Sequence, residues 1–241
     1  MKENVTYALI HSPLVGPFTW KLVYEALVSE GLKAIIPALF DNPRSSLPYW
    51  HQHVESVAQG LAQTPKNQSI VLVAHSGAGP LLPALRDRLP HTICAYVFVD
   101  AGIPQEGLSR IDLMRLEDPQ WADEFHKALL KGEQFPTWTE DDLREVIPND
   151  DTRRNLHAEI RPRALSFFTE PIPVFAGWPE APCVYIKFSQ SYNWDAEEAK
   201  RADWLVYELN AGHFHMLVQP LTVAELLVES TQRILDASGL K

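Results

Sequence analysis

Residues 69–89, SIVLVAHSGAGPLLPALRDRL, contain the pattern that decides the fold. An apolar, β-branched run leads into small residues around Ser76, and helix-forming residues follow. Ala74 and Ala78 stand two positions either side of Ser76, where a strained strand-to-helix turn accommodates only small side chains. Such a turn presents a serine at a helix N-terminus, where free N–H groups favour developing negative charge. The stretch predicts a nucleophilic serine, and the plainer alternative is that Ser76 only caps the helix.

The rest of the chain repeats this alternation of strand and helix. Helical spacing or composition marks 18–30, 47–63 and 79–89, and the segment 220–238 is typical of a final amphipathic helix. Continuous apolar strands that alternate with helices indicate an α/β fold with a mostly parallel six-stranded sheet flanked by helices. The runs expected to form the strands are 5–10, 33–39, 69–74, 95–99, 183–188 and 205–209.

The alternation stops between residues 104 and 180, where we find no convincing strand. Tryptophan, phenylalanine and proline accumulate there, and Asp118 is placed to N-cap a helix that has Pro119 at its first position. We expect 104–180 to form a helical cap inserted into a core built from 1–103 and 181–241, a single domain overall. An irregular surface excursion is the alternative.

A histidine motif follows the last predicted strand. The stretch ELNAGHFHMLVQP, residues 208–220, places His213 between that strand and the final helix. A general base there would face Ser76 across the carboxyl edge of the sheet and could take the hydroxyl proton. His215 competes with His213 for this role.

The turn IHSPLVGPFTW, residues 10–20, completes a resemblance to a known family. It aligns without a gap with the turn H-G-x-x-x-G-x-W-x-W of plant esterases. With the serine turn and the G-H stretch, the chain resembles the α/β-hydrolase superfamily over nearly its whole length, and in particular the compact plant methylesterase and hydroxynitrile lyase group. The resemblance implies that Ser76 is the nucleophile and that His213, directly after the glycine, is the base.

The acid of the expected triad has two candidates. In most of the superfamily it follows the strand seen here at 183–188, but Ser191 stands at the matching position and Asp195 comes four residues later. Certain lipases instead take the acid from the end of the preceding strand, where this chain has Asp100. Because an unpaired buried carboxylate at a strand end is costly, we expect Asp100 to be the acid and keep Asp195 as the alternative.

The oxyanion side of the site departs from the family pattern. The N–H of Gly77 is expected to be one donor, but the residue that would supply the second is Pro13, which has no N–H. Either the Leu14 N–H or the Ser12 hydroxyl would substitute, since losing one donor costs on the order of 3 kcal/mol. In the plant group, the lyases carry threonine or asparagine where Ser12 stands.

Composition limits the partners. Against 21 Lys+Arg the chain has 31 Asp+Glu, and a net charge of −10 disfavours nucleic acid and anionic membranes. No apolar stretch approaches the ~18 residues of a membrane span, and the beginning of the chain has no signal pattern, so we expect a cytoplasmic protein. Cys94 and Cys183 are expected to be buried free thiols. We expect no cofactor and no metal, because His51 and His53 lie on different helix faces.

The expected substrate is a small molecule with an apolar or aromatic body, because the insertion is rich in aromatic residues. The favoured reaction is hydrolysis of a small carboxylic ester or thioester through an acyl-enzyme. The alternatives are a lyase that uses Ser76 and His213 for proton transfer, and a non-catalytic ligand-binding protein. The sequence is also compatible with a homodimer. A cluster of arginines would either attract an anionic substrate such as an acyl carrier thioester or form local ion pairs. Its members are Arg153, Arg154, Arg161 and Arg163.

Overall fold

The computed structural model describes residues 5–42 and 44–237, and in these ranges six strands form one sheet. Their order is β2-β1-β3-β4-β5-β6, and every neighbouring pair is parallel, which confirms the predicted sheet. The second strand is shorter than expected because Pro37 cannot donate a ladder hydrogen bond. The strands are β1 (Val5–Ile10), β2 (Lys33–Ile35), β3 (Ser69–Ser76), β4 (Ile93–Ala101), β5 (Cys183–Lys187) and β6 (Leu205–Glu208).

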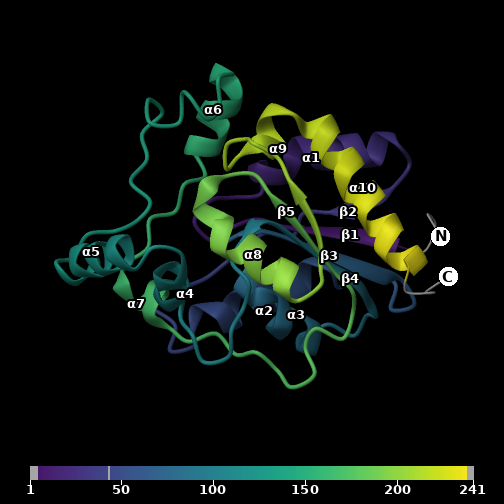
Figure 1. Ribbon diagram of the computed structural model, residues 1–241, viewed down its shortest axis with the longest axis horizontal. Coiled ribbons are helices and arrows are strands. Elements are labelled where there is room, and N and C mark those ends of the chain that lie inside the picture. The colour runs from purple at the N-terminus through teal and green to yellow at the C-terminus, as the bar shows by residue number, and fades with distance from the viewer. Residues whose placement is uncertain (1–4, 43, 238–241) are drawn as a thin grey trace.

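Helices cover both faces of the sheet (Figure 1). One face packs against α1 (Phe18–Ser29), α9 (His215–Val218) and α10 (Pro220–Ala237). The other face packs against α2 (Tyr49–Gly60), α3 (Leu82–Arg88) and α8 (Asn193–Arg201). Successive strand residues alternate between the two cores: Leu9 belongs to the first and Ile10 to the second.

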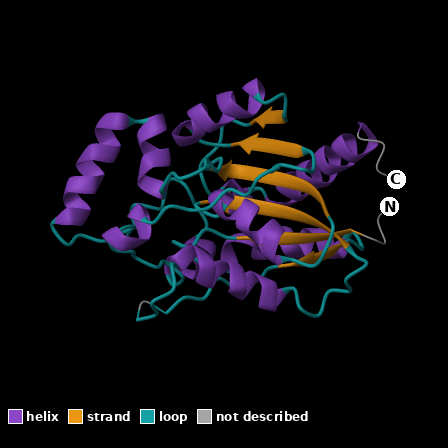
Figure 2. Ribbon diagram, turned by 90° about the horizontal axis from the view of Figure 1, so that it is seen from below, coloured by secondary structure: helices purple, strands orange, loops and turns teal. Residues whose placement is uncertain are grey.

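The segment 104–180 is helical and lies beyond the carboxyl ends of the strands. Figure 2 shows the strand arrowheads pointing toward its helices. The side chain of Asp118 accepts the Trp121 N–H at 3.0 Å and caps the helix that begins at Pro119, as the sequence predicts. The helices are α4 (Arg110–Glu117), α5 (Pro119–Leu130), α6 (Asp150–His157) and α7 (Leu165–Thr169).

The turn after β3 has the strained backbone that the sequence predicts. Ser76 ends the strand with φ 57°, a left-handed value that is uncommon for a residue other than glycine. The helical segment expected over 79–89 begins as a short 3₁₀ turn, η1 (Gly79–Leu81), and the α-helix α3 follows with Pro83 near its start. The cap residue of η1 is Ala78, so Ser76 does not serve as the cap.

Two further expectations concern the chain as a whole. Cys94 and Cys183 are both buried and free, as predicted. None of the helices within 5–42 and 44–237 combines the length and apolar character that crossing a bilayer requires.

Candidate active site

His213 and Asp100 form a hydrogen-bonded pair at the carboxyl edge of the sheet. Asp100 lies near the end of β4 and is wholly buried, and His213 follows β6 in the turn before α9. Their Nδ1 and Oδ2 atoms are 2.7 Å apart. The carboxylate also accepts the N–H groups of Phe188 and Ser189 and the Ser189 hydroxyl, at 2.6 to 2.9 Å. These donors stabilise the buried carboxylate, which in turn holds the Nδ1 side of the His213 ring.

The two competing candidates lie elsewhere. Asp195 Oδ1 accepts the Ile103 N–H at 2.7 Å and does not contact His213. His215 begins α9 and lies edge-on to the Phe188 ring, with centroids 5.3 Å apart. Of the two carboxylates and two histidines that the sequence leaves open, the structure brings Asp100 and His213 together.

Ser76 reaches the same site from β3, but its hydroxyl has a partner that the sequence analysis missed. Ser76 Oγ lies 3.1 Å from the hydroxyl of Tyr192, whose ring is stacked on that of His213 with centroids 5.3 Å apart. Burial, with the nearby charge of Asp100, raises the pKa of Tyr192, so the phenol stays protonated. Its only signal in the sequence is its place directly after Ser191, in the loop where the superfamily usually has its acid.

His75 precedes Ser76 in the sequence and packs against His213. Its Nε2 lies 3.1 Å from the His213 carbonyl oxygen, and the two ring centroids are 4.4 Å apart. Complete burial, together with the neighbouring His213, holds the pKa of His75 well below its usual value. A neutral His75 adds no positive charge beside His213.

The turn at 10–20 brings the Ser12 hydroxyl close to Gly77, one of the expected oxyanion donors. Ser12 Oγ accepts the Leu14 N–H at 3.3 Å, so this N–H is used within the turn. The same oxygen lies 3.3 Å from the point where a Cβ on Gly77 would stand. Pro13 lacks an N–H, but its carbonyl accepts Nη2 of Arg163 at 3.2 Å and so ties the turn to the 104–180 segment.

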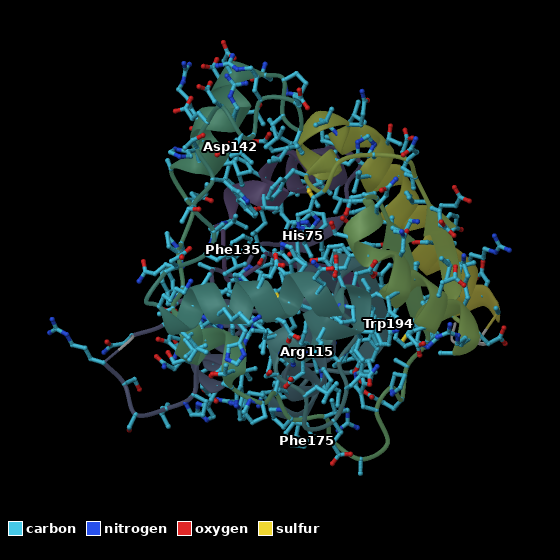
Figure 3. All side chains as sticks on the ribbon, turned by 60° about the vertical axis from the view of Figure 1, so that its left-hand side comes forward. His75, Arg115, Phe135, Asp142, Phe175 and Trp194 are labelled. Atoms are coloured by element: carbon cyan, nitrogen blue, oxygen red, sulfur yellow. The ribbon has the colours of Figure 1, made fainter. Side chains whose placement is uncertain are left out.

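A cavity of about 620 Å³ opens over Ser76, Gly77 and His213. In the view of Figure 3, His75 lies between Phe135, in the 104–180 segment, and Trp194, on α8. Five of the large aromatic residues of the insertion line the cavity. They are Trp121, Phe135, Trp138, Phe167 and Phe168.

Three carboxyl-bearing residues, Glu117, Asp118 and Asp195, line this largely apolar cavity. Asp195 lines it and is only 7% exposed, and Glu117, at the end of α4, lines it too. Burial, with smaller contributions from the charges of Glu117 and Asp100, raises the pKa of Asp195 to about 8. Glu117 Oε2 accepts the Trp194 N–H at 2.6 Å. Glu117 gave no signal in the sequence beyond its position beside the predicted cap helix.

Two of the four arginines of the insertion form the local ion pairs that were the alternative explanation, and the other two contact residues outside the insertion. Arg153 and Arg154 pair with Asp150 and Asp151, one turn away on α6. Arg163 binds Asp41 at 2.6 Å, a carboxylate that His53 also contacts. Arg161 donates to the Leu39 carbonyl oxygen. Within the described ranges, no group of three His, Cys, Asp or Glu residues is placed to hold a metal ion.

The doubly covered parallel sheet, with a serine on the turn after β3 and a histidine before the last helix, defines an enzyme of the α/β-hydrolase class. Residues 9–226 match the model of the alpha/beta hydrolase family, and the chain belongs to this family.

Among proteins of this family, the chain is similar to the plant methylesterases. It is 22% identical to methylesterase 17 of Arabidopsis thaliana over 93% of this chain and 90% of that protein. An extracellular α/β-hydrolase from a Paenibacillus species, described as homologous to tobacco salicylic acid binding protein 2, superposes with a TM-score of 0.74 at 17% identity, covering 94% of this chain and 98% of that one. Tomato methylketone synthase I, complexed with 2-tridecanone, superposes with a TM-score of 0.73 at 16% identity, covering 96% of this chain and 99% of that one. These solved structures support the fold.

Proposed function

We propose that the protein hydrolyses a small carboxylic ester through an acyl-enzyme, with Ser76 as nucleophile, His213 as general base and Asp100 as the acid that orients it. The observation that carries the proposal is the Asp100–His213 hydrogen bond of 2.7 Å at the base of the cavity that Ser76 lines. The methylesterase names of its relatives support ester cleavage as the reaction.

The proton route follows from the hydrogen bonds. Asp100 accepts the Nδ1 proton of His213, which leaves Nε2 with a lone pair to accept the Ser76 proton. Rotation about the Cα–Cβ bond of Ser76 turns its hydroxyl from Tyr192 toward that nitrogen as the substrate enters. Ser76 Oγ then bonds to the ester carbon, His213 returns the proton to the departing alcohol, and water releases the acid by the same route.

The negative charge of the tetrahedral intermediate is met by the Gly77 N–H and the Ser12 hydroxyl. Because the Ser12 oxygen already accepts the Leu14 N–H, its own proton is left to point at the oxyanion. The hydroxyl thereby replaces the backbone donor that Pro13 lacks. The stacked and edge-on aromatic walls favour an apolar or aromatic small molecule over a charged one.

The test is covalent trapping with a fluorophosphonate ester. We expect stoichiometric labelling of Ser76, identified by peptide mass spectrometry, together with loss of esterase activity. Ser76→Ala should abolish both. Activity of the Ser76→Ala protein equal to that of the wild type would refute the proposal.

Lyase chemistry is the second candidate, because a side-chain hydroxyl at position 12 faces the residue after the nucleophile. A lyase would break a cyanohydrin by proton transfer alone and would form no acyl-enzyme. Rapid acid quenching during ester turnover separates the two: acylated Ser76 supports hydrolysis, and cyanohydrin cleavage without acylation supports the lyase.

A further inference from the structure

Asp195 occupies an unusual place for a carboxyl group. It lies in the first turn of α8, lines the cavity above Ser76, and is more than nine-tenths buried. Its Oδ1 accepts the Ile103 N–H at 2.7 Å. Oδ2 has no hydrogen-bond partner among the described residues. It is not one of the side-chain atoms of these residues that are both unpaired and inaccessible to solvent. This second oxygen therefore opens onto the cavity.

The groups around Asp195 oppose its ionisation. No lysine, arginine or histidine of the described residues forms an ion pair with it, so burial is uncompensated by positive charge. From β6, which packs on the other side of α8, Glu208 pairs with Lys187 and Lys200 instead. The ionisable groups with the largest effect on Asp195, or that respond to it, are acidic: Glu117 on α4, Asp100 on β4, Glu198 on α8, Tyr185 on β5 and Tyr192 in η2 (Gln190–Tyr192). The basic side chains of Arg110 and His213 also line the cavity, but they pair with Glu170 and Asp100.

These surroundings leave Asp195 protonated at neutral pH. Its pKa is raised to about 8, and burial is the largest cause. A protonated carboxyl has one O–H to donate. Because Oδ1 is held by a backbone N–H, the O–H lies on Oδ2, the oxygen that faces the cavity.

We propose that Asp195 is a specificity-determining residue that donates a hydrogen bond to a second carbonyl oxygen of the substrate, one that is distinct from the ester being cleaved. The substrate class is a neutral ester with an apolar or aromatic body that carries this additional carbonyl. The inference rests on the proposed esterase function and deepens it. An anionic substrate is disfavoured because Glu117 and Asp118 line the cavity, whereas the guanidinium of Arg110 in the same lining is already paired with Glu170.

The physical basis is the cost of leaving a buried donor unpaired. An ester with a carbonyl at this point satisfies the Asp195 O–H, whereas an isosteric hydrocarbon leaves it without a partner. A buried hydrogen bond of this kind changes discrimination by about five- to thirtyfold. Ionised Asp195 has no proton to donate, and it would repel a carbonyl oxygen.

The experiment uses methyl phenylacetates that carry an acetyl or an isopropyl group, two substituents of similar shape, at each ring position in turn. The readout is the ratio of kcat/KM for the acetyl ester to kcat/KM for the isopropyl ester. We expect the wild type to prefer the acetyl ester about five- to thirtyfold at its best ring position near pH 6.5. This preference should fall as the pH rises through about 8, where Asp195 loses its proton.

Three variants test the residue. Asp195→Leu should abolish the acetyl preference, because leucine has no donor. Asp195→Asn should retain it and remove its pH dependence, because the amide N–H₂ donates at every pH. Glu197→Gln is the matched control: this exposed side chain on α8 pairs with Lys200 and does not line the cavity, so the preference should be unchanged.

The corresponding ratio of dissociation constants for the two esters is measured with the Ser76→Ala protein. The readout is the quenching of tryptophan fluorescence when the ligand contacts Trp121 and Trp138. If the esterase proposal fails, this binding ratio still reports on Asp195. An acetyl preference that is absent in the wild type at every ring position would overturn the inference. So would a preference that survives in Asp195→Leu, or one that is constant up to about pH 9.5 in the wild type.

Discussion

Replacing Asp100 by asparagine changes one atom of the carboxylate that holds His213. The amide oxygen can still accept the Phe188 and Ser189 N–H groups, but the amide nitrogen then faces His213 Nδ1. An N–H donor there makes Nδ1 the acceptor and moves the ring proton to Nε2, which can no longer take the proton of Ser76. A wrong tautomer of this kind lowers kcat by about ten-thousandfold, or about 5.5 kcal/mol of transition-state stabilisation.

The assay is steady-state hydrolysis of a soluble aromatic ester, with thermal unfolding measured alongside. We expect KM to change little, because Asp100 is not among the described residues that line the cavity. Asp203→Asn is a matched control, since Asp203 also has a left-handed backbone, with φ 58° against 45° at Asp100. A folded Asp100→Asn protein with kcat within tenfold of the wild type would refute the assignment. A larger loss of kcat in Asp195→Asn would transfer the acid role to Asp195.

Three further predictions follow from the same contacts. Ser12→Ala should lower kcat about a hundredfold while Ser12→Thr stays within tenfold, and an unchanged alanine variant would point to another oxyanion donor. Gly79→Ala should cost about 1–3 kcal/mol in urea unfolding, because the new Cβ would collide with the Gly102 carbonyl oxygen; equal stability would contradict this. The unfolded chain ionises Asp195 at its ordinary pKa of 3.8 and the folded protein at about 8. The free energy of unfolding of the wild type, relative to that of Asp195→Asn, should therefore fall by about 1.4 kcal/mol for each unit that the pH rises between these values. Parallel stability-against-pH curves for the two proteins would refute the neutral carboxyl.

The fold was predictable because its signals are local. Each strand is an apolar run, and the helix after Asp118 has a capping residue and a proline in the first turn. Differences arose where a proline overrides a pattern. Pro37 ends β2 early, and the α-helix of the 79–89 segment begins only after the 3₁₀ turn that contains Pro80.

The site was predictable only as far as the strand ends. Spacing along the chain places Ser76, Asp100 and His213 at the same edge of the sheet, but it does not say which carboxylate meets the ring. The choice depends on the path of the segment after β5, because the backbone N–H groups of Phe188 and Ser189 in this segment bind the Asp100 carboxylate. The Tyr192–Ser76 contact joins residues 116 positions apart, and no motif announces it.

The position of Asp100 on β4 has a consequence for how this enzyme can change. Ser76 and Asp100 project from neighbouring strands, so their separation is fixed by the hydrogen-bonded ladder of the sheet. In most of the superfamily the loop after β5 must carry the acid and is constrained by that duty. With Asp100 as the proposed acid, the segment after β5 is released from that duty, and its residues Tyr192, in η2, and Asp195, in α8, line the cavity instead. Substitutions in this segment are therefore expected to alter which molecules are accepted while the proposed proton-transfer residues keep their geometry.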